Sequence, residues 1–271
     1  MEETKNKSSK FKKFLNCSLI ICLILLFFSG FKILQYNLDA RANKKLIEKV
    51  AQSITVDESI EDIKYNSIGE FIEDKNNQEV VDSAKKKYKI DFDTLKEENS
   101  DTVGFLRVKG TDVEFVVVQS VDNDYYLTHN FERSSNKAGW IFADYRNKLD
   151  GTDKNIVIYG HNMLNGSMFS TLSNVLEREW FEDIGNRFIT FTTENESAIY
   201  QVFSVYQTQD NDYYTTTNFT DEEFEQYLNT VLENSIYGFD TNVKITDQIL
   251  TLITCGRSNS NRILVHAKKL N

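Results

Sequence analysis

The pattern of apolar and polar positions divides the chain into three parts, of which the first is an uncharged apolar run at residues 14–31. Its length of about 18 residues meets the lower limit for a helix that crosses a membrane. Five lysines precede the run, and a basic flank of this kind stays in the cytoplasm. We therefore expect a cytoplasmic tail at 1–13, a single-pass signal-anchor in the cell membrane at 14–34, and an extracellular domain beyond it.

A cleaved signal peptide is the alternative interpretation of this segment. Ala40-Arg41-Ala42 loosely fits a small-x-small cleavage site. That site lies about ten residues beyond the apolar run, however, and the run is long for the core of a signal peptide. The pattern therefore favours an uncleaved anchor.

The second part, residues 40–99, is highly charged and has apolar residues three or four positions apart. This spacing is typical of amphipathic helices, so we expect two or three of them. They predict a helical stalk and N-terminal helices over residues 35–90, linking the membrane to a folded core.

In the third part, after Ser100, short runs of β-branched and aromatic residues replace the helical spacing. Eight such runs predict strands, at 102–110, 113–120, 138–146, 155–162, 187–193, 198–208, 248–255 and 262–270. Eight strands in one mainly β domain predict a closed barrel or a sandwich. We place this domain at residues 91–271.

Two helices are expected between the strands. One covers residues 167–181. The other begins at Thr220, where Thr220 and Glu223 are spaced as a capping box and Phe219 and Phe224 as a hydrophobic staple. Its apolar residues fall on one face, which should pack against the strands: Phe224, Leu228, Val231 and Leu232.

Charge and cysteine content limit the function. The chain has 31 basic and 41 acidic residues; without the five lysines and two glutamates before residue 14, 26 basic and 39 acidic residues remain, a net charge of −13. An acidic ectodomain argues against nucleic acid as a partner. Cys17 and Cys22 lie in the apolar run, so the exported part holds one thiol, Cys255, which cannot form an intramolecular disulfide and is a candidate reactive group.

A nucleophilic thiol needs a base or cation beside it and a donor for the oxyanion that it generates. Of the three histidines, His161 follows an apolar strand and opens a loop flanked by glycine, His129 lies in a predicted loop, and His266 lies inside the last strand. A single histidine or arginine is more often structural than catalytic. It is their coincidence at strand ends that singles out His161, Cys255 and Arg262.

At these positions the chain resembles the class B sortases, thiol transpeptidases of Gram-positive cell surfaces. TLITC matches the TLxTC signature, Arg262 opens the next strand, and NIVIYGHNM supplies the matching histidine strand. Further segments are similar in the same order: DFDTLKEENSDTVGFLRV, NDYYLTHNF, AGWIFADYRN and GHNMLNGSMFSTL. The resemblance covers residues 91–270 and implies an eight-stranded sortase barrel with a helix inserted before the nucleophile strand.

The resemblance also implies roles for individual residues. Cys255 would attack a C-terminal sorting signal of a surface protein and form a thioacyl enzyme. His161 would act as general acid and base, and Arg262 would hold the substrate and the oxyanion. The acceptor would be an amine of a peptidoglycan precursor. No cofactor or metal is needed, and no loop has EF-hand-like acidic spacing that would suggest calcium.

The substrate groove is expected at Asn123, Leu127, Tyr213 and Tyr214, with Thr254 beside the nucleophile. For each of these residues, packing in the core or on the surface is an equally good explanation. The sorting motif stays open between an Asn-Pro-x-Thr-Asn type and a Pro-x-Thr-Gly type.

Two other functions remain alternatives. An L,D-transpeptidase would use Arg257, two residues after the thiol, but that family places histidine and glycine directly before its cysteine, where this chain has Ile253 and Thr254. A membrane-tethered adhesion or binding domain would explain the anchor, the acidic surface and the barrel. It would leave the joint occurrence of the histidine, cysteine and arginine motifs unexplained.

Overall fold

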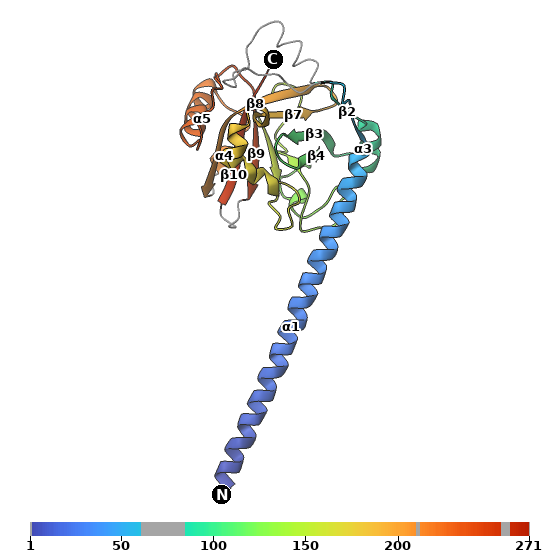
Figure 1. Cartoon of the computed structure of the whole chain (residues 1–271), viewed down its shortest axis with the longest axis vertical. Helices are drawn as coiled ribbons and strands as arrows, with labels where there is room; N and C mark the ends of the chain where they lie inside the picture. Colours follow the sequence, from blue (N-terminus) through green and yellow to red (C-terminus); the bar gives the residue numbers. More distant parts are fainter. Residues whose placement is uncertain (1, 61–84, 210–211, 256–260, 271) are drawn as a thin grey trace. The chain divides into compact units, whose positions relative to one another are not determined.

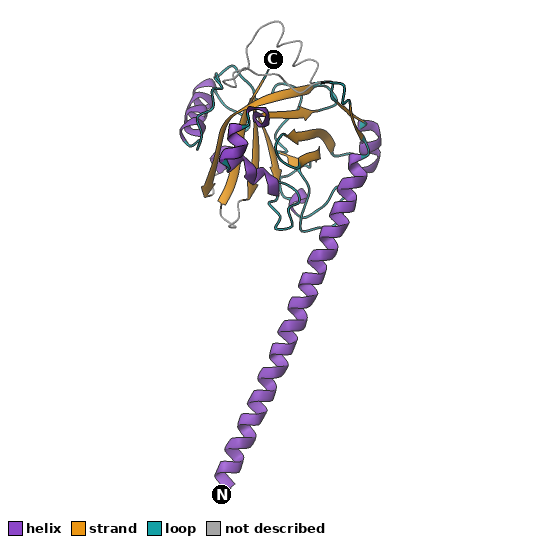
Figure 2. Ribbon diagram, viewed as in Figure 1, coloured by secondary structure: helices purple, strands orange, loops and turns teal. Residues whose placement is uncertain are grey.

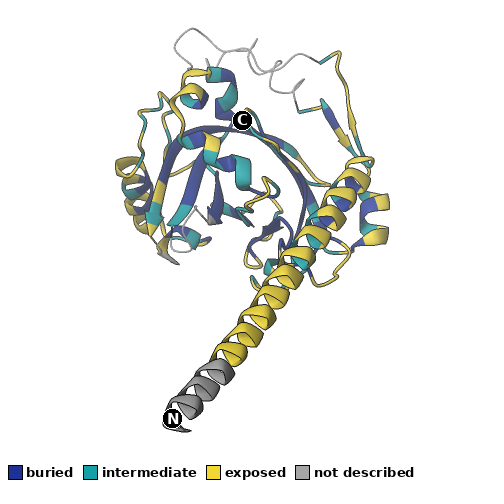
Figure 3. Cartoon of the chain, turned by 60° about the horizontal axis from the view of Figure 1, so that its bottom comes forward, coloured by how far each residue is buried: buried dark blue, intermediate teal, exposed yellow. Residues whose placement is uncertain are grey.

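The computed structural model describes residues 2–60, 85–209, 212–255 and 261–270, in two compact units at residues 1–43 and 44–271. Helix α1 (Glu2–Ala51) begins in the first unit and ends in the second. From Leu15 onward it is long and apolar enough to cross a membrane. Its apolar side chains at residues 15–34 are exposed, as the yellow colouring in Figure 3 shows. This helix is consistent with the expected anchor.

A closed barrel of eight strands forms most of the second unit (Figures 1 and 2). The strand order around the barrel is β10-β8-β7-β3-β4-β5-β6-β9, and the pairs β4–β5 and β6–β9 are parallel. The strands are β3 (Thr102–Val108), β4 (Val113–Val118), β5 (Phe142–Ala143), β6 (Asn155–Gly160), β7 (Phe188–Thr192), β8 (Ser197–Gln209), β9 (Ile249–Cys255) and β10 (Asn261–Lys269). All eight correspond to strands expected from the sequence, and closure of the sheet confirms the barrel.

Between α1 and the barrel, the secondary structure differs from the all-helical expectation. β1 (Ile54–Val56) pairs antiparallel with β2 (Tyr88–Ile90), in a segment whose spacing predicted helix, and α3 (Phe92–Glu98) follows. Tyr88 is buried, and its ring lies 5.6 Å from that of Phe105 in β3. Pairing with β1 and packing on the barrel therefore outweigh the local helical pattern.

The helix expected at 167–181 is replaced by two short elements. A 3₁₀ segment, η2 (Ser170–Leu176), is followed by Glu177, and α4 (Arg178–Glu182) begins directly after this residue. Glu177 has an extended backbone with φ −87° and ψ 143°, which breaks the helical hydrogen-bond pattern. The break lets Leu172, Val175 and Trp180 all reach the core. The remaining 3₁₀ segments are η1 (Tyr125–Leu127), η3 (Ile184–Arg187) and η4 (Asp212–Thr215).

The second expected helix is α5 (Asp221–Glu233), and its predicted start is confirmed. Thr220 and Glu223 form a reciprocal capping box, and the rings of Phe219 and Phe224 lie 5.1 Å apart. Its buried residues are Phe224, Tyr227, Leu228 and Val231. Leu232, expected on this face, is 40% exposed. Tyr227 is buried on this face instead.

Two hydrophobic clusters lie on opposite faces of the same strands. Leu250, Leu252 and Val265 belong to the larger cluster, whereas Ile249 and Leu264 belong to a second cluster together with α5. Because side chains alternate along a strand, this division separates an inner face from a face covered by α5. Figure 3 shows how much of the barrel is buried (dark blue). The expected catalytic residues His161, Cys255 and Arg262 lie where β6 and β9 end and where β10 begins.

Candidate active site

The register of three neighbouring strands brings the expected catalytic positions together. Cys255 is the last residue of β9 and pairs with Arg262 of β10. On the other side of β9, Thr254 pairs with Gly160, the last residue of the parallel strand β6. The next residues along these two strands are His161 and Cys255. The backbone therefore places Cys255 between the histidine strand and the arginine strand, at one end of the barrel.

His161 is held by both its ring and its backbone. Its Nε2 lies 2.8 Å from the carbonyl oxygen of Leu127, and its own carbonyl accepts a hydrogen bond from Phe169 N at 2.9 Å. A carbonyl oxygen can only accept, so Nε2 must carry the proton. In the neutral ring, Nδ1 is then the basic nitrogen. The imidazole is half-buried and oriented by a backbone group that substitution of a side chain cannot remove.

Arg262 is half-buried at the start of β10. It pairs with Cys255 of β9 on one side and with Thr208 of β8 on the other. Strand pairing on both sides therefore fixes the backbone of Arg262. A cation held in this way suits the stabilisation of developing negative charge. Arg257, the alternative cation, lies outside the described residues.

Among the residues expected in the groove, Leu127 and Asn123 make polar contacts with the segments around His161 and Asp144. Leu127 holds His161 through its carbonyl, as described above. Asn123 uses its amide within the protein: Nδ2 donates to Asp144 Oδ2 at 2.9 Å, and Oδ1 accepts from Tyr145 N at 3.0 Å. These contacts orient the segment that leads into η1.

The other three expected groove residues differ in exposure. Tyr213 is 37% exposed, and its ring packs on Tyr214 and Tyr227. Tyr214 is buried in the second cluster, with its ring 5.4 Å from that of Tyr206. Thr254 is 1% exposed in β9. Exposure therefore favours Tyr213 over Tyr214 and Thr254 as a side chain that meets a substrate.

Asp144, which the sequence reasoning missed, links the surrounding segments. It is fully buried, and Arg146 binds it in a bidentate manner, with Nε to Oδ1 at 2.8 Å and Nη2 to Oδ2 at 2.7 Å. Tyr159 Oη donates to Oδ2 at 2.7 Å, beside the bond from Asn123. The only sequence signal is the motif ADYRN, in which acid and base are two residues apart.

These contacts determine the ionisation of the Asp144 network. Burial by itself would raise the pKa of Asp144, but the hydrogen bonds from Arg146, Tyr159 and Asn123 outweigh it and hold the pKa below its usual value. Burial and the Asp144 charge raise the pKa of Tyr159. Asp144 is therefore a carboxylate at neutral pH and Tyr159 a neutral donor.

The other two histidines serve the packing of the fold. His129 stacks on Tyr125, with ring centroids 4.1 Å apart, and its Nδ1 lies 2.8 Å from the Tyr125 carbonyl. His266 is fully buried, between Tyr206 Oη and Thr251 Oγ1, each 3.0 Å from a ring nitrogen. Burial lowers the pKa of His266 to about 3, so this ring is neutral. Neither histidine competes with His161 as the base.

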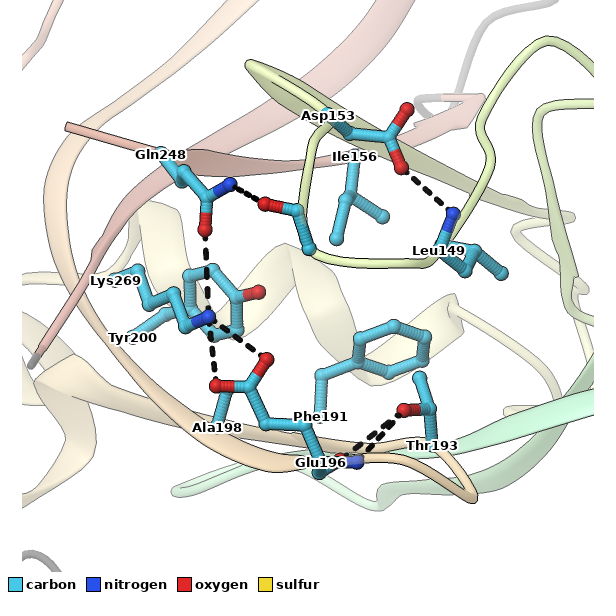
Figure 4. A pocket seen from close by; sticks show the side chains of 11 residues that line it. Leu149, Asp153, Ile156, Phe191, Thr193, Glu196, Ala198, Tyr200, Gln248 and Lys269 are labelled. Carbon is cyan, nitrogen blue, oxygen red and sulfur yellow. Dashed lines mark hydrogen bonds and ion pairs between the residues drawn. The ribbon is translucent and has the colours of Figure 1, made fainter. Parts of the chain in front are cut away.

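A small pocket lies at the opposite end of the barrel (Figure 4). Its lining includes Gln248, directly before β9, and Lys269, the last residue of β10. Lys269 pairs with Glu196 at 2.7 Å, and Asp153 accepts from Leu149 N at 2.7 Å. Its volume of about 20 Å³ is room for a single water. This pocket is therefore no substrate site.

In the described ranges, no group of three or more His, Cys, Asp and Glu residues could hold a metal ion.

Comparison with known proteins identifies relatives of this chain. A family model described as "Sortase domain" matches residues 106–270. The protein named Sortase B from Listeria monocytogenes is 39% identical over 202 residues, covering 69% of this chain and 80% of that protein. Sortase B from Staphylococcus aureus is 29% identical over 263 residues, covering 96% of this chain and 98% of that protein.

Solved structures give the same result. Clostridium perfringens sortase B matches with a TM-score of 0.62 and 37% identity, covering 66% of this chain and 100% of that one. A Bacillus anthracis sortase B complex matches with a TM-score of 0.68 and 29% identity, covering 86% and 99%. A Staphylococcus aureus sortase B–substrate complex matches with a TM-score of 0.62 and 34% identity, covering 66% and 84%.

Proposed function

Because the chain belongs to the sortase family and is a cysteine transpeptidase of the sortase B type, we propose that Cys255, His161 and Arg262 carry out its reaction. The family acts in anchoring surface proteins to the cell wall. Membership of the sortase family decides against the two alternative functions raised by the sequence, an L,D-transpeptidase and an adhesion domain. The observation that carries the proposal is the pairing of Cys255 with Arg262, beside the strand that leads to His161.

In the first half of the proposed reaction, the Cys255 thiolate attacks the carbonyl carbon of the sorting signal. A C–S bond forms, and the carbonyl oxygen takes the negative charge, which Arg262 stabilises. The C–N bond then breaks, and protonated His161 gives a proton to the leaving amine. The product is a thioacyl enzyme and a free C-terminal peptide.

In the second half, an amine of a peptidoglycan precursor attacks the thioacyl carbon. Neutral His161 removes a proton from the amine, the new C–N bond forms, and the C–S bond breaks to regenerate the Cys255 thiolate. The Leu127 carbonyl supports this role, because it accepts from Nε2, fixes the ring and makes Nδ1 the nitrogen that gains and loses the proton. No step of this chemistry calls for a metal or cofactor.

We further propose that α1 anchors the enzyme in the cell membrane, with the N-terminus in the cytoplasm and the catalytic domain outside. The apolar run within α1 and the five lysines before that run support this orientation. The substrates would be surface proteins with a C-terminal signal of the Asn-Pro-x-Thr-Asn or the Pro-x-Thr-Gly type.

The test is cleavage of quenched fluorescent peptides of both types by the full-length chain in detergent. Cys255→Ala, His161→Ala and Arg262→Ala are measured beside the wild type, with His129→Ala as a matched histidine control. We expect cleavage of one peptide type that all three site variants lose and the control keeps. A folded wild-type chain that cleaves neither type, with or without an added amine, would refute the proposed function.

A further inference from the structure

The Asp144 carboxylate connects segments that are far apart in the sequence. Tyr159, which binds it, lies in β6 two residues before His161. Asn123, which also binds it, precedes η1, whose last residue Leu127 holds the His161 ring. The carboxylate is fully buried and its partners hold the pKa down. It is therefore a fixed anion that joins the histidine strand to the segment beside it.

Arg146 extends this connection to a third segment. While Nε and Nη2 bind Asp144, Nη2 also donates to the Thr215 carbonyl at 2.7 Å. Thr215 ends η4, the 3₁₀ segment that contains Tyr213. A planar guanidinium can donate to a carboxylate and a carbonyl together, in a geometry that a lysine ammonium does not reproduce.

The carbonyls on either side of Thr215 are also held by side chains. The Tyr214 carbonyl accepts from Tyr227 Oη at 3.3 Å, and the Thr216 carbonyl accepts from Asn155 Nδ2 at 2.9 Å. Three successive carbonyls thus meet donors from α5, from β6 and from the loop after β5. Tyr227 and Asn155 are buried core residues, whereas the Arg146 side chain is 36% exposed. Arg146 is the member of this set that can be changed with least disturbance of the core.

We propose that Asp144 and Arg146 are positioning residues for substrate recognition, which fix residues 213–216 relative to the strand that leads to His161. This inference rests on the proposed function, because it takes Tyr213 as part of the groove. The ion pair acts through the backbone of the segment, so it sets how well the sorting peptide fits. The thiol chemistry at Cys255 does not depend on it.

The test compares Arg146→Gln with Arg178→Gln in the full-length chain. Arg178 is the matched control because its exposed side chain forms an ion pair with Glu182 at 2.6 Å within α4 and has no contact with Asp144 among the described hydrogen bonds. We expect Arg146→Gln to raise KM for the cleaved peptide about tenfold, as for the loss of one charge-assisted hydrogen bond. The turnover number of Arg146→Gln should stay close to that of the wild type. Arg178→Gln should match the wild type in KM.

A second readout separates positioning from a general loss of structure. The second readout is the rate at which iodoacetamide alkylates Cys255, followed by peptide mass spectrometry. Because this small reagent does not bind in the peptide groove, the rate should be unchanged in Arg146→Gln. Arg146→Lys keeps the positive charge without the planar fork, and we expect its KM to be raised as well. If Arg146→Gln is unfolded at the assay temperature, Arg146→Lys carries the same expectation.

The outcomes distinguish this inference from the function on which it rests. A wild type that cleaves no peptide overturns the proposed function, and the inference with it. A wild type that cleaves, together with an unchanged KM in Arg146→Gln, overturns the inference alone. A parallel fall of turnover and alkylation rate would also overturn it, because Arg146 would then support the whole site.

Discussion

Stability in acid should depend on the neutral state of His266. The ring is fully buried and bonded to Tyr206 and Thr251. Thr251 Oγ1 donates its proton to the side-chain amide oxygen Oδ1 of Asn155 at 2.7 Å. Thr251 must therefore accept from His266 Nδ1, and His266 Nε2 accepts from Tyr206 Oη. Both ring nitrogens are therefore occupied with one proton between them, and a second proton has no acceptor in this arrangement.

The magnitude follows from the pKa. Burial lowers the pKa of His266 from 6.5 to about 3, so between these values the unfolded chain binds a proton that the folded chain does not. Stability from this group is fully present above pH 6.5 and is lost as the pH falls toward 3. Linkage gives a loss of about 2 kcal/mol between pH 7 and pH 5.

The assay is urea unfolding of the full-length chain in detergent, followed by tryptophan fluorescence. The two tryptophans of the chain, Trp140 and Trp180, are both buried and report on the folded core. His266→Gln retains a donor and an acceptor but does not titrate, and His129→Gln is the control. We expect the stability of the wild type to fall by about 2 kcal/mol more than that of His266→Gln from pH 7 to pH 5. Equal pH dependence in the two proteins would refute this reasoning.

Two further substitutions test the scaffold. Gly160→Ala should cost about 1–3 kcal/mol by overpacking and reduce peptide cleavage, because the new Cβ would lie 2.5 Å from Ile141 Cδ1 and 2.6 Å from Phe169 Cγ, and Phe169 N holds the His161 carbonyl. Gly238→Ala, with nothing within 4 Å of its Cβ, is the control in the same unfolding and cleavage assays, and equal behaviour of the two variants would contradict the packing argument. Thr220→Ala should cost about 1 kcal/mol through loss of the capping box of α5, measured as a lower urea midpoint; an unchanged midpoint would show that the cap adds nothing here.

The strands and α5 could be predicted because their signals are local. β-branched runs mark each strand of the barrel, and Thr220 with Glu223 marks the start of α5. Where tertiary contacts decide, the pattern was insufficient. Tyr88 lies in a strand because its ring packs on Phe105. Glu177 interrupts a segment whose apolar spacing predicts one helix.

The candidate site could be proposed from the sequence only in part, for a related reason. Cys255, His161 and Arg262 stand at strand ends, where motif and position coincide. Asp144 directly follows the short strand β5, and its importance comes from partners as distant as Asn123 and Tyr159. Contacts made by backbone carbonyls, such as those of Leu127 and Thr215, carry no side-chain signal that a sequence could display.

The most direct test of the central claim is intact mass spectrometry of the full-length chain incubated with a cleavable sorting peptide. We expect an adduct with the mass of the acyl fragment, which peptide mapping places on Cys255 and not on Cys17 or Cys22. The adduct should be absent in Cys255→Ala and should disappear when an acceptor amine is added. If the wild-type chain cleaves the peptide but never carries an adduct on Cys255, the thiol is not the nucleophile.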